Sequence, residues 1–315
     1  MGVFSSGGGS RLRLGTRGSP LALIQAEMVR TALVRVHGDL EVEIVAVRTT
    51  GDRVRDRPLA EIGGKALWTK ELDEALLAGE VDACVHSMKD VETIRPVDVV
   101  VAAVLPRADV RERLIGAPSV SALPIGATVG TASARREAQL RRLRPDLRIV
   151  PIRGNIATRL AKLAAGEVDA TLLAAAGLAR IGREDVGSAI PITEMLPPAG
   201  QGAIGVETLA DGPARCFVAA INDEQTSCCV AAERALLSAL RAGCRSPVGA
   251  FAHHHAGELW LRVELLSTDG RDRVADCTIL RSGGITPAVV ANNLLSRAPA
   301  SLAKIFTGSN SAAHT

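Results

Sequence analysis

Two adjacent charged residues, Lys89 and Asp90, follow a short, largely apolar stretch at residues 81–88. A run of this length that contains valines and a cysteine favours a buried strand of a mixed or parallel sheet. Open α/β sheets bind their ligands beyond the carboxyl ends of the strands. The pattern therefore predicts that this lysine and this carboxylate lie at a ligand site.

Arginines recur at comparable points of the chain. Arg17 precedes a predicted helix, and further arginines follow predicted strands or open the next helix, at Arg135, Arg136, Arg153, Arg159 and Arg180. Any single one of them is ordinarily a solvated side chain. Several at strand ends favour a ligand with several carboxylates or phosphates, because guanidinium groups pair with these in bidentate fashion.

The elements that position these residues can be predicted from local patterns. Apolar residues at helical spacing predict a helix over residues 66–78, ended by Gly79. Residues 11–15 predict a first strand, and Ser19-Pro20 supplies an N-cap and a first-turn proline for the helix that follows. Arg17 and Ser19 are thus expected at a strand-to-helix turn.

A weak internal repeat predicts two similar α/β lobes. The sequence AGEVDA occurs at residues 78–83 and again at 165–170, each time between a predicted helix and an apolar strand. Gly130-Thr131 likewise matches Gly15-Thr16. A ligand cleft is expected between two such lobes. Residues 52–64 are polar and rich in turn residues, which fits either a mobile loop over the site or an ordinary surface loop.

The pattern changes after residue 200. Residues 203–207 predict a strand that returns the chain to the first lobe. A helix at residues 227–241, strands near 247–254, 258–267 and 271–280, and a helix at 286–303 predict a small α+β part. We therefore expect an α/β protein with two lobes and a separate C-terminal portion.

Composition narrows the class of protein. The chain has 315 residues, 47% apolar content and a net charge of +3. Aromatic residues make up only 2% and Tyr is absent, which disfavours a stacking surface for nucleic acid. Six arginines between positions 135 and 148 leave a salt-dependent RNA-binding protein as an alternative.

Other features predict a cytosolic protein without metal or membrane. No apolar run approaches the roughly 18 residues of a membrane span, and the Gly/Ser-rich start lacks the features of a signal peptide. Met1-Gly2 with Ser6 fits a loose myristoylation pattern, but a Gly/Ser-rich leader is the better explanation. The six cysteines show no zinc spacing and are expected to be reduced, and the three histidines at residues 253–255 are expected at a hairpin tip.

Eight stretches in order resemble the hydroxymethylbilane synthase, or porphobilinogen deaminase, family. They are GTRGSPLAL (15–23), GGKALWTKEL (63–72), VHSMKD (85–90), GTASARR (130–136), IRGNIATRL (152–160), LAAAGLAR (173–180), AGQGAIGVE (199–207) and GCRSPVGA (243–250). The resemblance implies three domains, the first two like the lobes of periplasmic-type binding proteins. They would comprise residues 1–105 with 201–221, then 106–200, then 222–315.

The resemblance also implies a covalent cofactor. Family members carry dipyrromethane through a thioether to the cysteine of the GC-x-x-P motif, which is Cys244 here. From the residues alone this thiol is either reactive or inert. The implied enzyme is a monomeric transferase of heme and tetrapyrrole biosynthesis. It condenses four porphobilinogen molecules onto the cofactor with loss of ammonia, and water then releases the linear tetrapyrrole.

The resemblance assigns roles to the charged residues. Asp90 matches the catalytic aspartate, since a fixed carboxylate near the ring N–H would stabilise the positive charge left when ammonia departs. The acetate and propionate arms of each pyrrole account for the arginines. Residues implied to hold the cofactor are Ser87, Lys89, Thr131, Ser133, Arg135, Arg136 and Arg159. Residues implied to hold the substrate are Arg17, Ser19, Arg153, Arg159 and Arg180.

The chain departs from the family pattern at three positions. Glu61 stands where many relatives have Lys, Trp68 where they have Phe, and Ala132 where they have a Ser that donates to the cofactor. The alternative function is a two-lobed binding protein that captures an anionic metabolite without chemistry. Cys244 in an added third domain disfavours that alternative, because a binding protein has no need of it.

Overall fold

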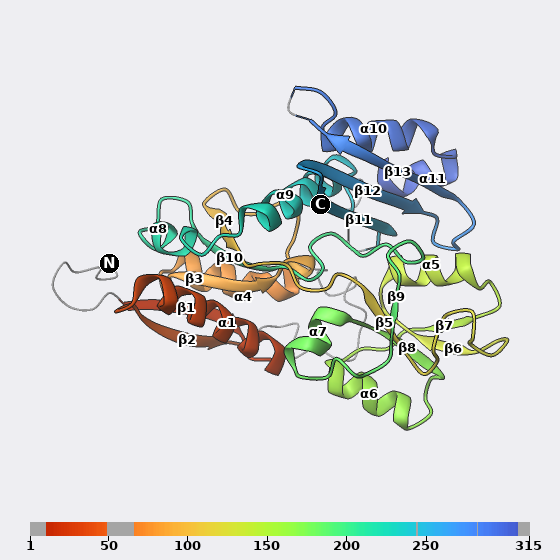
Figure 1. Ribbon diagram of the computed structural model, residues 1–315, viewed down its shortest axis with the longest axis horizontal. Coiled ribbons are helices and arrows are strands. Elements are labelled where there is room, and N and C mark those ends of the chain that lie inside the picture. The colour runs from red at the N-terminus through yellow and green to blue at the C-terminus, as the bar shows by residue number, and fades with distance from the viewer. Residues whose placement is uncertain (1–10, 49–65, 244, 282, 308–315) are drawn as a thin grey trace, which may run out of the picture. The chain divides into compact units, whose positions relative to one another are not determined.

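The computed structural model describes residues 11–48, 66–243, 245–281 and 283–307 (Figure 1). The chain forms two compact units, Met1–Ala108 with Gly202–Cys228, and Asp109–Gln201 with Cys229–Thr315. The first unit is therefore discontinuous in sequence. The finer division into three domains stays a prediction.

The first unit contains a five-stranded mixed sheet in the order β2-β1-β3-β10-β4. β1 is parallel to β2 and β3, whereas β10 is antiparallel to β3 and β4. Pairing of β10 with β3 returns the chain to the first sheet, as the sequence predicted. The strands are β1 (Arg11–Arg17), β2 (Glu41–Val47), β3 (Ala83–Ser87), β4 (Val99–Val104) and β10 (Ile204–Leu209).

Helices cover this first sheet with apolar side chains on both faces. Helix α1 (Pro20–His37) buries Val29 and Leu33 against Leu12 and Leu14 of β1. Helix α4 (Ala66–Leu77) buries Leu72 and other residues in a separate cluster with Val81 and Val99. The short α8 (Ala214–Ala219) adds Val218 to the cluster of α1. A buried sheet of this kind gives the strand ends a rigid support.

The second unit repeats this arrangement. Its five-stranded sheet has the order β7-β6-β8-β5-β9, in which β6 is parallel to β7 and β8 and β5 is antiparallel to β8 and β9. The elements are β5 (Glu112–Ile115), β6 (Thr128–Gly130), α5 (Ala134–Leu143), β7 (Arg148–Val150), α6 (Ile156–Ala164), β8 (Ala170–Ala174), α7 (Ala175–Arg180) and β9 (Ser188–Ile190).

The repeated AGEVDA stretches have the same structural role in both units. Gly79 and Gly166 follow helices α4 and α6 with φ values of +70° and +72°, a conformation that favours glycine. Asp82 then accepts a 2.7 Å hydrogen bond from the backbone N–H of Arg13, and Asp169 accepts one of 2.7 Å from Thr128. Each carboxylate thus ties the start of the central strand, β3 or β8, to its parallel neighbour, β1 or β6.

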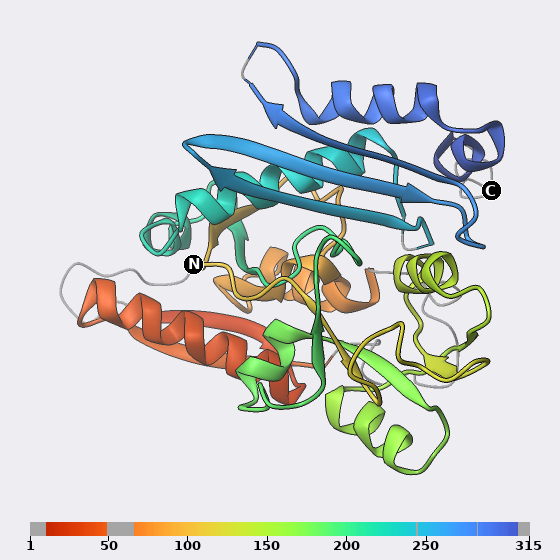
Figure 2. The same ribbon diagram turned by 45° about the vertical axis from the view of Figure 1, so that its right-hand side comes forward.

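The C-terminal portion contains a three-stranded antiparallel sheet, β11 (Val248–His255), β12 (Glu258–Leu266) and β13 (Arg273–Leu280). Helices α9 (Glu224–Ala239), α10 (Pro287–Arg297) and α11 (Ala300–Thr307) contribute to its core, and Figure 2 shows α10 lying along the sheet. The predicted single helix at residues 286–303 is wrong. Pro299 interrupts it, because the residue before a proline is driven to an extended conformation, as at Ala298 with ψ of 138°.

Within the described ranges, no helix has the length and apolar character needed to cross a bilayer. The α/β fold class is confirmed by the two mixed sheets with their helices and by the separate antiparallel sheet.

Candidate active site

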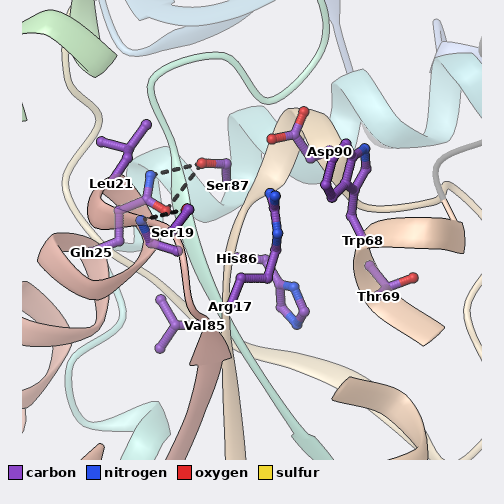
Figure 3. A pocket seen from close by; sticks show the side chains of 11 residues that line it. Arg17, Ser19, Leu21, Gln25, Trp68, Thr69, Val85, His86, Ser87 and Asp90 are labelled. Carbon is purple, nitrogen blue, oxygen red and sulfur yellow. Dashed lines mark hydrogen bonds between the residues drawn. The ribbon is translucent and has the colours of Figure 1, made fainter. Parts of the chain in front are cut away.

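A pocket of about 60 Å³ lies in the first unit at the carboxyl ends of β1 and β3 (Figure 3). It brings together four of the predicted site residues, although they are far apart in sequence. The lining residues are Arg17, Ser19, Leu21, Ala22, Gln25, Trp68, Thr69, Val85, His86, Ser87 and Asp90.

Neighbouring parallel strands explain why these residues meet. β1 ends at Arg17 and β3 ends at Ser87, and because the two strands are parallel, both end at the same edge of the sheet. Ser19 caps α1, because its hydroxyl accepts a 3.3 Å hydrogen bond from the N–H of Ala22. The buried Gln25 of α1 donates from Nε2 to the Ser87 hydroxyl at 2.7 Å. The N-cap of Ser19 and the contact between Gln25 and Ser87 hold the turns after β1 and β3 in place.

Asp90 closes a short 3-10 turn, Met88–Asp90, directly after β3. Met88 is buried and packs so closely against Gly205 of β10 that any side chain at residue 205 would collide with its sulfur. This contact anchors the turn to the sheet. Asp90 remains partly exposed at the pocket, while Lys89 of the same turn is not among the lining residues.

A buried charged cluster connects to the wall of the pocket through His86. Nε2 of His86 lies 3.2 Å from Oε2 of Glu207, without the alignment of a directed hydrogen bond. Arg95 donates to both oxygens of Glu207, at 2.9 and 2.8 Å, and also pairs with Asp73. Sequence reasoning missed this cluster; its local signal is a glutamate inside a largely apolar strand.

The pKa values in this cluster reflect competition between burial and pairing. Burial alone would raise the pKa of Glu207, but the contacts with His86 and Arg95 outweigh it and hold that pKa at about 2. Burial raises the pKa of Asp73 despite the opposing effect of Arg95. Glu207 is therefore the ionised centre of the cluster.

In the second unit, the predicted residues Thr131 and Ser133 form the turn from β6 into α5. Thr131 donates its N–H to the carbonyl of Val150 at 2.9 Å, and its hydroxyl accepts from the N–H of Ser133 at 3.2 Å. The Ser133 hydroxyl caps α5 by accepting from the N–H of Arg136 at 3.4 Å. Backbone N–H groups at such a helix start favour an anion.

Arg135 and Arg136 are buried and share one carboxylate, that of Glu112. Arg136 donates to its two oxygens at 3.0 and 2.6 Å, and Arg135 pairs with the same side chain. Burial lowers the pKa of Arg135 despite the attraction of Glu112. With all three groups ionised, the trio carries a net positive charge. Sequence reasoning missed Glu112, which begins β5; direct contact of the two arginines with a cofactor stays a prediction.

Arg153 and Arg180 have the character expected of anion ligands. Nη1 of Arg153 is buried and has no hydrogen-bond partner among the described residues. Burial lowers the pKa of Arg180 to about 10. Arg159 donates from Nε to the carbonyl of Gly154 at 3.0 Å. Because a buried guanidinium N–H requires an acceptor, a carboxylate ligand fits at Nη1 of Arg153.

Cys244, Glu61 and the predicted loop at residues 52–64 lie outside the described residues. Of the remaining cysteines, Cys84 is buried, and burial raises the pKa of its thiol well above the ordinary value. Such a thiol is a weak nucleophile. Among the described residues, no group of three or more His, Cys, Asp or Glu side chains could hold a metal ion.

Comparison with known proteins gives consistent matches along the chain. The family model described as "Porphobilinogen deaminase, dipyromethane cofactor binding domain" matches residues 12–215, and that described as "Porphobilinogen deaminase, C-terminal domain" matches residues 227–288.

Relatives named porphobilinogen deaminase match most of the chain. One from Sphingopyxis alaskensis is 53% identical, covering 94% of this chain and 96% of its own. One from Paracoccus denitrificans is 46% identical, covering 92% and 95%. Among solved structures, the methionine-binding protein MetQ overlaps 69% of this chain and 92% of its own, with a TM-score of 0.44 and 13% identity.

Proposed function

Since this chain belongs to the porphobilinogen deaminase family, whose members are transferases of tetrapyrrole biosynthesis, we propose which of its residues bind and activate the substrate. The reaction is the stepwise deaminative condensation of four porphobilinogen molecules, followed by hydrolytic release of linear hydroxymethylbilane. The family is defined by a dipyrromethane cofactor, which supplies the pyrrole end to which the first substrate molecule is joined.

Asp90 is the catalytic carboxylate in this proposal. Loss of ammonia from porphobilinogen leaves an electron-poor ring, and a fixed carboxylate near the ring N–H stabilises the charge as it develops. The position of Asp90 in one pocket with Arg17 and Ser19 is the observation that carries the assignment. The anchored Met88 supports it, because a preorganised carboxylate needs a rigid turn.

The carboxylate arms of the pyrroles are bound by hydroxyl and cationic side chains. We assign the incoming substrate to Arg17, Ser19, Arg153, Arg159 and Arg180. The buried and unpartnered Nη1 of Arg153 supports this set, because a bound carboxylate would supply an acceptor there. The cofactor is assigned to Ser87, Lys89, Thr131, Ser133, Arg135, Arg136 and Arg159, with Cys244 as its point of attachment.

We further propose that the protein acts in the cytosol as a monomer and binds no nucleic acid. Five cysteines among the described residues are free thiols, which suits a reducing compartment. Sedimentation of the purified protein at several concentrations tests the monomer. A sedimentation coefficient that rises with concentration would contradict it.

Intact-mass measurement tests the whole proposal. The purified chain is expected to carry an increment of two pyrrole units and, with porphobilinogen added, to gain further pyrrole units one at a time. Tetrapyrrole should then accumulate in solution. A chain that stays unmodified and binds porphobilinogen without consuming it would instead support the two-lobed binding protein.

A further inference from the structure

The indole of Trp68 lies beneath the guanidinium of Arg17. The Cζ atom of Arg17 is 3.8 Å from the centroid of the ring, within the range of a cation–π contact. Figure 3 shows both side chains at the pocket that Asp90 also lines. Trp68 lies in the first turn of α4 and Arg17 at the end of β1, so the contact joins two separate elements.

This contact restricts the orientation of the Arg17 guanidinium. A guanidinium that rests on a ring face directs its N–H groups outward in its own plane, where they can pair with a carboxylate in bidentate fashion. Restricting the side chain before binding reduces the entropy lost when the ligand arrives. α4 is held in place by its buried Leu72, so the indole is itself a fixed support.

We propose that Trp68 is a positioning residue that holds Arg17 ready to receive a carboxylate arm of the incoming porphobilinogen beside Asp90. This inference rests on the proposed role of Arg17 as a substrate ligand. It gives a physical role to the tryptophan that replaces the phenylalanine of the family pattern, because the larger indole offers a stronger cation–π surface.

The test compares Trp68→Leu, Trp68→Met and Trp68→Phe in holoprotein whose cofactor load is verified by intact mass. Loss of the ring is expected to raise KM for porphobilinogen about 5- to 30-fold, equivalent to about 1 to 2 kcal/mol, and to change kcat less than about threefold. Trp68→Phe should raise KM far less than Trp68→Leu does, because a smaller ring face remains. Trp68→Met fills much of the space without a ring and serves if Trp68→Leu folds poorly.

A double-mutant cycle shows whether Trp68 acts through Arg17. In an Arg17→Leu background, Trp68→Leu should raise KM no further, because the group that it positions is gone. An equal rise in both backgrounds, or a KM within twofold of wild type for both Trp68→Leu and Trp68→Met, overturns the inference. If Arg17→Leu alone leaves KM unchanged, the proposed substrate role of Arg17 fails instead, and the inference fails with it.

Indole fluorescence gives a readout that is independent of turnover. The chain contains two tryptophans, and the other, Trp260, lies on β12. In a Trp260→Phe variant, porphobilinogen is expected to change the emission of Trp68 at once, before elongation, and Arg17→Leu should reduce that change. Emission that is insensitive to porphobilinogen, or equally sensitive without Arg17, would overturn the proposal.

Discussion

Nε2 of His86 lies 3.2 Å from Oε2 of Glu207, so a residue that lines the pocket contacts a fully buried carboxylate. The two belong to the neighbouring antiparallel strands β3 and β10, on which Gly205 pairs with His86 and Glu207 with Cys84. β3 leads directly into the turn that bears Asp90. The charged cluster therefore fixes the strand from which the proposed catalytic carboxylate emerges.

Glu207→Gln is expected to destabilise the protein by about 3 to 5 kcal/mol at neutral pH, because it leaves the guanidinium of Arg95, whose side chain is only 7% exposed, undercompensated. Urea unfolding followed by circular dichroism measures the change. The matched control is Glu258→Gln, which breaks the exposed pair with Arg281 and should cost under about 1 kcal/mol. Equal effects of the two substitutions would contradict the structural role of the cluster.

The same carboxylate predicts acid sensitivity. Its pKa is about 2 in the folded protein, below the ordinary value of 4.5, so unfolding takes up a proton between these limits. The contribution of ionised Glu207 to the free energy of unfolding is fully present above pH 4.5 and is lost as pH falls towards 2. Unfolding free energies measured from pH 6 to 3 should fall less steeply for Glu207→Gln than for wild type. Equal pH dependence of the unfolding free energy in wild type and Glu207→Gln would contradict the assignment of this acid sensitivity to Glu207.

Arg135→Leu and Arg136→Leu are expected to yield mainly apoprotein, whereas Arg17→Leu and Arg153→Leu should yield holoprotein that elongates poorly. Intact mass and single-turnover assays separate the two groups. Full cofactor loading in both groups of variants would contradict the division of these arginines into cofactor ligands and substrate ligands.

Arg135→Leu and Arg136→Leu are also expected to affect stability, because both arginines pair with Glu112. Because Glu112 balances both arginines, either leucine variant also disturbs a buried charge pair, and Glu112→Gln should cost about 3 to 5 kcal/mol by leaving two buried cations. Thermal melts therefore accompany the mass spectra. Apoprotein from Arg136→Leu that melts as wild-type apoprotein does would assign the loss to cofactor binding and not to misfolding.

Asp90→Asn is expected to load cofactor at least in part and to lose turnover by about 10²- to 10³-fold or more, because the amide supplies no negative charge. Asp90→Glu should keep a small activity, since the charge returns on a longer arm and a misplacement of about 1 Å costs on the order of 10²-fold. Single-turnover assays with porphobilinogen measure both. An Asn variant that melts early but elongates at the wild-type rate would make Asp90 a structural residue only.

Cys244→Ser should abolish stable cofactor attachment, because a hydroxyl is a far weaker nucleophile than a thiol near neutral pH. Cys277→Ser, which changes an exposed free thiol on β13, is the control and should keep the dipyrrole mass. A Cys244→Ser chain that still carries that mass would refute the attachment site.

Local sequence determined most of the elements and the family. Ser19-Pro20 begins α1 because capping depends on adjacent residues. The recurrence of AGEVDA predicted a repeat, and in both copies the glycine after the helix has a φ in the left-handed region. The one long helix predicted after residue 285 failed at Pro299, where a local signal was present but was outweighed by the apolar periodicity.

Only the tertiary structure decided the partners of the charged and aromatic residues. Glu112 meets Arg135 and Arg136 because β5 enters the sheet beside β8, and Trp68 meets Arg17 because α4 packs near the end of β1. Propensity and periodicity act over a few residues, whereas these contacts depend on strand order and register across dozens of residues. For that reason the sequence identified which side chains could do chemistry, and the fold alone determined which of them lie together.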